Sequence, residues 1–178
     1  MDLYAELILD HAKAPHHAGL RAPYDIEVQQ VNPVCGDEVT LRLHLTGAGA
    51  DAVVQDVSYD AQGCAISKAS TSVLTDLVIG HPVSNAVNVG EAIREMVRTR
   101  DGSEPDEDVL GDAIALQGVA KYPARVKCAL LGWTALSEAL LLSGALAPSA
   151  GPETAEPENT LPEKTLPENT LPEKEHAS

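Results

Sequence analysis

The sequence contains no phenylalanine, and aromatic residues make up only 3% of its 178 residues. Its core must therefore be built from Leu, Val, Ile and Ala, and the 44% hydrophobic content is enough for one domain with a sizeable core. Basic residues are also scarce, since 12 Lys and Arg stand against 27 Asp and Glu. The net charge of −15 argues against nucleic acid and anionic membranes as partners, because both require clustered positive charge.

Long apolar runs and an export signal are lacking as well. No stretch approaches the roughly 20 apolar residues that a membrane span requires. The first residues, MDLYAELILDHAK, are amphipathic and carry acids instead of a cationic start. We therefore expect a cytoplasmic protein. Its three cysteines cannot all pair within one chain, so we expect free thiols or metal ligands in the reducing cytosol.

Hydrophobic periodicity predicts that strands come first and most helices follow. Strict alternation over 39–45 predicts a strand with one buried face, and weaker strands are predicted over 26–31 and 52–59. Helices are predicted over 2–13, over 66–78, from Asn88 to Val97, briefly around 109–114, and from Pro123 to Leu140. This order predicts an α+β domain, in which several helices pack on one face of a three-stranded antiparallel sheet.

The composition changes at about residue 147. The last part of the chain contains TLPEK, TLPEN and TLPEK, so a proline recurs every five residues. Prolines at this spacing prevent a regular helix, and one leucine per unit cannot form a core. We therefore predict one domain over 1–146 and a disordered, acidic, proline-rich tail over 147–178.

Two cysteines lie beside glycines at predicted turns. In NPVCGDEV, Gly36 lets the backbone bend between Cys35 and Asp37, so that a thiol and a carboxylate can point to one place. In AQGCAIS, Gly63 ends a predicted strand, and Cys64 stands at or just before the first turn of a helix. The partial positive charge of a helix N-terminus lowers the pKa of a thiol placed there.

The third cysteine, Cys128, follows Pro123 in KYPARVKCALLGW, and proline favours the first turn of a helix. Arg125 and Lys127 add positive charge close to Cys128. These surroundings predict a thiol that is readily ionised.

Other interpretations of these residues remain open. A single cysteine is more often a small buried hydrophobe, and the chain has no C-x-x-C pair. Together with Asp37, the three thiols would nevertheless make a four-ligand tetrahedral site. His11, His16 and His17 are interpreted as surface histidines, and the acidic run over 104–108 as a solvated loop.

Four segments together resemble the SufU-type branch of the NifU/IscU-like iron–sulfur assembly proteins. They are LYAELILDHAKAPHHAG, NPVCGD, GCAISKASTSVLTD and LQGVAKYPARVKCALLGWTAL, and they occur in the family's order over residues 2–142. The resemblance implies that Cys35, Asp37, Cys64 and Cys128 hold a metal ion. It also implies that Cys128 accepts sulfur, and Arg125 would hold the anionic thiolate or persulfide.

The residue before the last cysteine separates two versions of this function. IscU-type scaffolds carry a histidine there, whereas this chain has Lys127, which favours Zn²⁺ over a resident [2Fe–2S] cluster. The resemblance then implies a zinc-dependent sulfurtransferase. It would take persulfide sulfur from a SufS-type, PLP-dependent cysteine desulfurase and pass it to a downstream Suf cluster-assembly scaffold. The alternatives are an IscU-like scaffold that builds a [2Fe–2S] cluster on the same residues, and a purely structural zinc protein.

Overall fold

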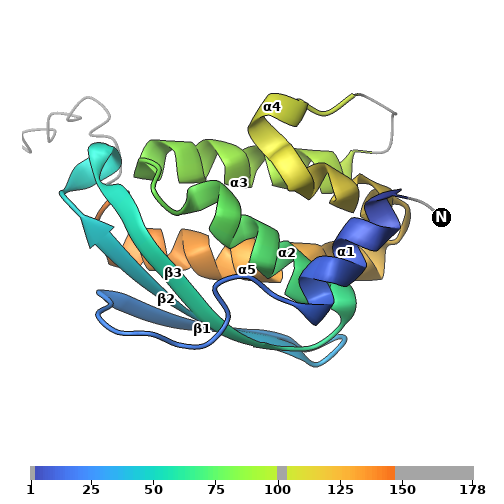
Figure 1. Cartoon of the computed structure of the whole chain (residues 1–178), viewed down its shortest axis with the longest axis horizontal. Helices are drawn as coiled ribbons and strands as arrows, with labels where there is room; N and C mark the ends of the chain where they lie inside the picture. Colours follow the sequence, from blue (N-terminus) through green and yellow to red (C-terminus); the bar gives the residue numbers. More distant parts are fainter. Residues whose placement is uncertain (1–2, 100–103, 147–178) are drawn as a thin grey trace, which may run out of the picture.

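The computed structural model describes residues 3–99 and 104–146, so the tail predicted over 147–178 lies outside the described residues. Three strands form one antiparallel sheet in the order β1-β2-β3 (Figure 1). The strands are β1 (Ile26–Asn32), β2 (Asp37–Thr46) and β3 (Val53–Gln62). The helices are α1 (Leu3–Lys13), α2 (Ala65–Val78), α3 (Val83–Arg98), α4 (Glu107–Leu110) and α5 (Pro123–Leu142), with 3₁₀ segments η1 (Gly49–Asp51) and η2 (Gly111–Lys121). The predicted α+β class is confirmed.

The sheet brings two connections together at one end. Asn32 pairs with Asp37 across the β1–β2 hairpin, and Glu38 pairs with Gln62 where β3 ends. The turn over 33–36 and the start of α2 therefore lie at the same edge. The predicted alternation in β2 is also observed, because the side chains of Val39, Leu41 and Leu43 are fully buried.

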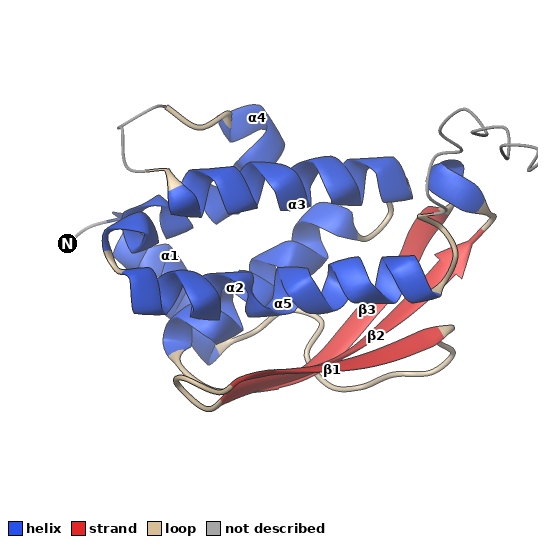
Figure 2. Ribbon diagram, turned by 180° about the vertical axis from the view of Figure 1, so that it is seen from behind, coloured by secondary structure: helices blue, strands red, loops and turns tan. Residues whose placement is uncertain are grey.

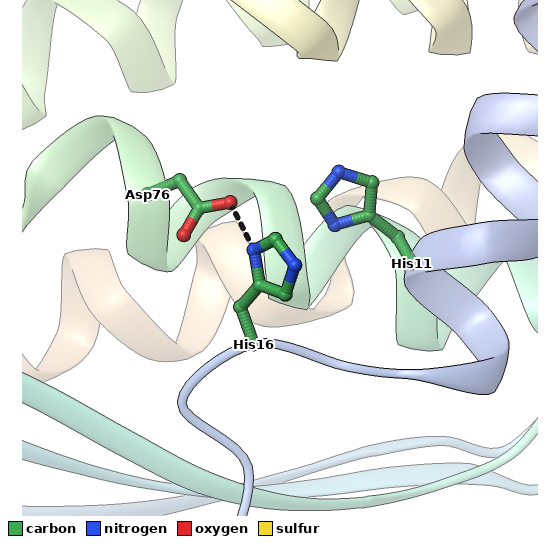
Figure 3. A group of neighbouring side chains, drawn as sticks. All are labelled: His11, His16 and Asp76. Carbon is green, nitrogen blue, oxygen red and sulfur yellow. Dashed lines mark hydrogen bonds and ion pairs between the residues drawn. The ribbon is translucent and has the colours of Figure 1, made fainter.

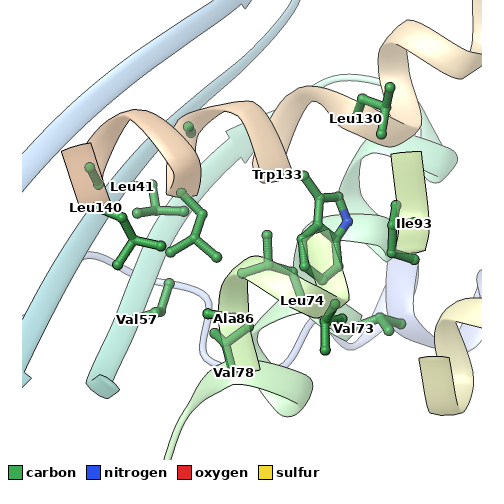
Figure 4. Close-up of a cluster of buried hydrophobic side chains, with 14 of the residues drawn as sticks. Leu41, Val57, Val73, Leu74, Val78, Ala86, Ile93, Leu130, Trp133 and Leu140 are labelled. Carbon is green, nitrogen blue, oxygen red and sulfur yellow. The ribbon is translucent and has the colours of Figure 1, made fainter. Parts of the chain in front are cut away.

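The helices cover one face of the sheet (Figure 2). Helix α5 packs along β1 and β2, α2 packs against β3, and α3 lies over α2 and α5. Trp133 of α5 is 1% exposed and lies among Leu74 of α2 and Ile93 of α3 (Figure 4). The single tryptophan is thus a large aromatic side chain in a core otherwise built mainly from Leu, Val, Ile and Ala.

Helices α2 and α5 are joined by direct contacts. The Ser70 hydroxyl donates to the carbonyl of Ala129 over 2.6 Å and accepts from the Trp133 indole N–H over 3.1 Å. A β-carbon at Gly132 would lie 2.6 Å from Oγ1 of Thr71, so only glycine allows this approach. These contacts fix the first half of α5, which carries Cys128, against α2.

Two helix predictions need correction. Helix α3 begins at Val83, five residues before the predicted start at Asn88, because Pro82 ends the preceding turn and serves as the N-cap without a side-chain hydrogen bond. The helix predicted around 109–114 is split into α4 and the 3₁₀ segment η2, because the backbone at Gly111 takes a positive φ of 46°. Part of the acidic run belongs to α4, whose N-cap Asp106 accepts the Asp108 N–H over 3.0 Å.

Over residues 3–99 and 104–146, none of the helices has both the length and the apolar character that crossing a membrane demands.

Candidate metal centre

Cys35 lies at the tip of the β1–β2 hairpin, and Asp37 is the first residue of β2. The hairpin is closed by Asn32, whose carbonyl accepts the Gly36 N–H over 2.8 Å and whose Oδ1 accepts the Val34 N–H over 3.1 Å. Gly36 adopts a φ of +72°, which a glycine reaches without steric cost. The exposed Cys35 and the buried Asp37 carboxylate are therefore held on one side of a tight turn.

Cys64 reaches the same place from the end of β3. It is the N-cap of α2, as predicted, and its Sγ accepts the Ser67 N–H over 3.5 Å. Its own N–H donates to Oδ1 of Asp37 over 3.2 Å. Because Glu38 and Gln62 are paired, the start of β2 and the start of α2 are neighbours, and Asp37 links them.

Cys128 comes from the second turn of α5, six residues into the helix from Pro123. It is 4% exposed. Its Sγ lies 3.2 Å from Sγ of Cys35 and 3.9 Å from Nδ2 of Asn32. The contact with the buried Asn32 was not anticipated from the sequence, in which Asn32 is only a turn former.

The structure thus gathers most of the predicted ligand set. Ligand atoms of Cys35, Asp37 and Cys128 lie within 4.8 Å of one another. Cys64 is outside that group but contacts Asp37 through its backbone N–H. Two thiols and one carboxylate consequently meet at one place, with Cys64 beside Asp37, although Cys35 and Cys128 are 93 positions apart in the chain.

The charge state of Asp37 suits a ligand. Burial raises the pKa of this carboxyl, but the nearby thiols of Cys128 and Cys64, the Cys64 N–H and the Cys35 thiol outweigh burial, so the pKa lies below its ordinary value. The carboxylate is therefore charged at neutral pH, even though the residue is 3% exposed. A buried charge of this kind needs a partner.

The prediction that Cys128 ionises readily is wrong when only the surrounding protein groups act on its thiol. Burial, the contact with Cys35 and the neighbouring Asp37 carboxylate raise the pKa of the Cys128 thiol well above its ordinary value. Its place in the second turn of α5 also takes it away from the free N–H groups of the first turn. A thiolate at this position requires a cation, because a metal ion deprotonates a coordinating thiol outright.

The residues present fit a zinc ion. Oδ2 of Asp37 is fully buried and has no hydrogen-bond partner among the described residues, which is a costly arrangement for a carboxylate oxygen unless a cation binds it. Cysteine sulfur and carboxylate oxygen are also both ligands that zinc takes in tetrahedral sites. Cys35, Asp37, Cys64 and Cys128 are therefore the residues that could hold the ion.

Among the described residues, neither of the two basic neighbours of Cys128 makes a hydrogen bond with its thiol, and Arg125 contacts an aromatic ring instead. The guanidinium of Arg125 lies over the Tyr122 ring, 4.9 Å from its centroid, and both side chains are exposed. Lys127 is exposed too. The role of Arg125 at the thiol stays a prediction.

One interpretation of the histidines is wrong. His11 is 4% exposed, not a surface residue, because α1 packs against α2 and brings the ring to Ser72. His16 lies between His11 and Asp76 (Figure 3). The sequence could not show this cluster, since Asp76 is 60 residues away from His16.

Comparison with known proteins gives consistent matches. The model of the NifU-like N terminal domain matches residues 3–129, a span that includes all three cysteines. The chain is 39% identical over 137 residues to the zinc-dependent sulfurtransferase SufU of Bacillus subtilis (strain 168), covering 76% of this chain and 88% of that protein. It is 38% identical over 138 residues to the iron–sulfur cluster assembly scaffold protein IscU of Streptococcus pyogenes serotype M1, covering 78% and 82%.

A solved structure agrees with these matches. It is a Fervidobacterium islandicum AW-1 protein described as an iron–sulfur cluster assembly scaffold for the SUF system, with 37% identity and a TM-score of 0.60. The alignment covers 76% of this chain and 94% of that one. The sequence comparison and the structure comparison thus match the chain to the same group of proteins.

Proposed function

The chain belongs to the family of NifU-like N-terminal domains and is an iron–sulfur cluster assembly protein of the SufU/IscU kind. We propose that in cluster assembly it acts as a zinc-dependent sulfur acceptor. The sulfur donor is a SufS-type, PLP-dependent cysteine desulfurase, and the recipient is a Suf scaffold. The similar proteins carry both names, sulfurtransferase and scaffold, at 39% and 38% identity, so identity alone does not choose between them.

The observation that carries the proposal is the donor set around Asp37. The thiols of Cys35 and Cys128 lie with the Asp37 carboxylate, whose Oδ2 is buried and unpartnered among the described residues, and Cys64 adjoins Asp37 through its backbone N–H. These donors complete the four positions of one tetrahedral zinc ion. The residue before Cys128 is an exposed lysine, so it adds no imidazole to the set.

Zinc bound here would supply positive charge that keeps the thiols ionised, and it would act as a template without generating hydroxide. The protein residues then perform the transfer. The Cys128 thiolate attacks the outer sulfur of the donor's persulfide, a new S–S bond forms on Cys128, and the donor's S–S bond breaks to leave a cysteine thiolate. No oxidant is needed, because one S–S bond replaces another.

The surroundings of Cys128 set the conditions for this step. Cys128 is buried, whereas Cys35 at the hairpin tip is exposed, so the partner must open the hairpin tip to reach the acceptor. Arg125 and Lys127, both exposed near the first turns of α5, would attract the anionic persulfide and stabilise it after transfer. The chemistry is confined to the domain over 1–146, and we assign no part in it to the tail.

The test is alanine release by the desulfurase in the presence of substoichiometric zinc-loaded protein and a reductant, followed by mass spectrometry of the three cysteines. We expect faster turnover and a persulfide on Cys128. Cys128→Ser should abolish both, whereas Leu141→Ala, a change at an exposed position of the same helix, should alter neither. Circular dichroism of both variants controls for folding.

Two results would count against the sulfur-acceptor role. Normal persulfide uptake by Cys128→Ser would show that another residue accepts sulfur. No stimulation of the desulfurase, together with uptake of iron and sulfide as a coloured cluster, would assign the scaffold role to the same residues.

A further inference from the structure

A second group of metal-type donors lies away from the thiols. Ligand atoms of His11, His16 and Asp76 are within 4.8 Å of one another. They come from three parts of the chain: the last turn of α1, the loop after it, and the last turn of α2 (Figure 3). We propose that these three residues bind a divalent cation of the zinc type, at a site separate from the thiol centre.

One serine, Ser72, holds both the ring of His11 and the backbone of His16 in place. Nδ1 of His11 lies 2.9 Å from Oγ of Ser72, and the same oxygen accepts the backbone N–H of His16 over 2.8 Å. A hydrogen bond at one ring nitrogen fixes the orientation of a histidine and presents the other nitrogen to a metal. His11 is buried, so its orientation is further restricted by packing.

The distances suit a shared ion. Nδ1 of His16 lies 2.6 Å from Oδ2 of Asp76. Zinc binds imidazole nitrogen and carboxylate oxygen at about 2.0–2.2 Å, which places tetrahedral ligand atoms roughly 3.3 Å apart. Atoms already within 4.8 Å of one another can reach that spacing through side-chain rotations, without a change in the backbone.

Further donors surround the three residues. Nε2 of His17 lies 3.9 Å from Oδ1 of Asp76, and Oδ2 of Asp112 in η2 lies 3.7 Å from Nε2 of His11. Either side chain, or water, can complete the coordination. An ion at this point would therefore join α1, the loop after it and α2, and with Asp112 as a ligand also η2.

The charge around the cluster favours a cation. Over the described residues, the ion pairs of Asp76 and Asp112 are made with histidines and not with lysine or arginine. Two carboxylates in this region therefore lack a permanent positive partner, in a chain with a net charge of −15. Imidazole and carboxylate together select a borderline divalent ion such as zinc.

The site is distinct from the thiol centre. Cys64 caps the N-terminus of α2, and Asp76 lies 12 positions further along it. At 1.5 Å per residue, the two are about 18 Å apart along the helix. One ion cannot serve both groups, so the two occupancies can be counted independently.

Zinc itself is the probe for the test, with the untagged full chain and a chromogenic chelator as competitor. We expect two zinc equivalents for the wild type and one for His16→Gln. His16 is half exposed, so the substitution should leave the fold unchanged. The matched control is His44→Gln, because His44 makes a similar pair with Asp25 (Nδ1 to Oδ2, 3.0 Å) but belongs to no three-donor group among the described residues. It should keep both equivalents.

Cobalt substitution provides a second measurement that does not depend on any variant. A thiolate-bound Co²⁺ gives a strong near-ultraviolet charge-transfer band, whereas a Co²⁺ bound by imidazole and carboxylate gives only weak visible bands. Titration should show two spectral phases in the wild type and only the thiolate phase in His16→Gln. A single zinc equivalent in the wild type, or two equivalents in His16→Gln, would overturn the proposal and leave the cluster as a hydrogen-bonded clamp between α1 and α2.

Discussion

Gly63 lies directly against the carboxylate of Asp37. A β-carbon at residue 63 would be 2.5 Å from Cγ and 2.6 Å from Oδ1 of Asp37, closer than any real side chain can approach. The contact arises because β3 ends beside the start of β2. Gly63 thus belongs to the candidate metal centre because its missing side chain leaves room for the Asp37 carboxylate.

Gly63→Ala should displace the Asp37 carboxylate and weaken zinc binding by more than about tenfold, an effect of the size seen when groups that orient metal ligands are removed. The measurement is a zinc competition titration that follows the thiol centre. Gly80→Ala is the matched control at the other end of α2, since Gly80 also has a positive φ, of 82°, but a β-carbon there meets nothing within 4 Å. Both variants should lose stability from backbone strain. If Gly80→Ala weakens zinc binding as much as Gly63→Ala does, strain and not the contact with Asp37 is responsible.

Asp37→Ala should reduce zinc affinity at the thiol centre, because it removes the one oxygen ligand and leaves three thiols. The same titration measures the affinity, and the rate of persulfide formation on Cys128 is measured alongside it. Asp60→Ala, a change at an exposed aspartate in β3, is the control and should change neither quantity. Unchanged zinc affinity in Asp37→Ala would mean that Asp37 is not a ligand.

Gly132→Ala should lower the free energy of unfolding by about 2 kcal/mol, the usual cost of forcing an extra carbon into a packed interface. The new β-carbon would meet Thr71 at 2.6 Å and push α5 away from α2. Gly118→Ala adds the same atom at a position with nothing within 4 Å and should be close to neutral. Urea unfolding of both variants gives the comparison. If Gly132→Ala is as stable as the wild type, then α5 and α2 can move apart without a loss in the free energy of unfolding.

Tyr59 should make stability depend on alkaline pH. Burial raises the pKa of its phenol to about 12, Ser72 acts against the shift, and the charge of Asp76 adds to it. The raised pKa means that the stabilising effect is complete below pH 10 and is lost as the pH rises towards 12, since the unfolded phenol ionises first. The loss should be roughly 3 kcal/mol at most.

The measurement for Tyr59 is urea unfolding at pH 9, 10 and 11 of the wild type and Tyr59→Phe. The difference in stability between the two proteins should move in favour of Tyr59→Phe as the pH rises. Tyr122→Phe removes an exposed phenol and serves as the control. Parallel pH curves for the wild type and Tyr59→Phe would contradict the assignment.

The sheet and the two core helices followed from the sequence because their hydrophobic periods are strong. Alternation in β2 identified the buried face, and the apolar period together with Pro123 identified α5. The start of α3 did not follow, because Asn88 and Glu91 imitate a capping box inside the helix, while the true N-cap is Pro82, which forms no side-chain hydrogen bond. Likewise no period indicates that Gly111 ends α4 and that a 3₁₀ segment follows.

The residues of the candidate metal centre were predicted from sequence motifs, but the direction of the pKa shift of Cys128 was not. A motif identifies which residues are present, whereas the pKa of Cys128 depends on burial and on Cys35 and Asp37, which only the fold brings near. The contact between His16 and Asp76 likewise depends on how α1 packs against α2. Contacts between residues 60 or more positions apart leave no local pattern in a single sequence.

The order of the thiols along the chain has a consequence for biosynthesis. A nascent chain that has emerged as far as α2 already carries Cys35, Asp37 and Cys64, but the third thiol lies on α5, the last helix of the described domain. The centre can therefore be completed only after α5 has been made and has docked on α2 and the sheet. A metal ion held by all four residues would mark a chain whose domain has finished folding, and an incomplete chain would hold such an ion poorly.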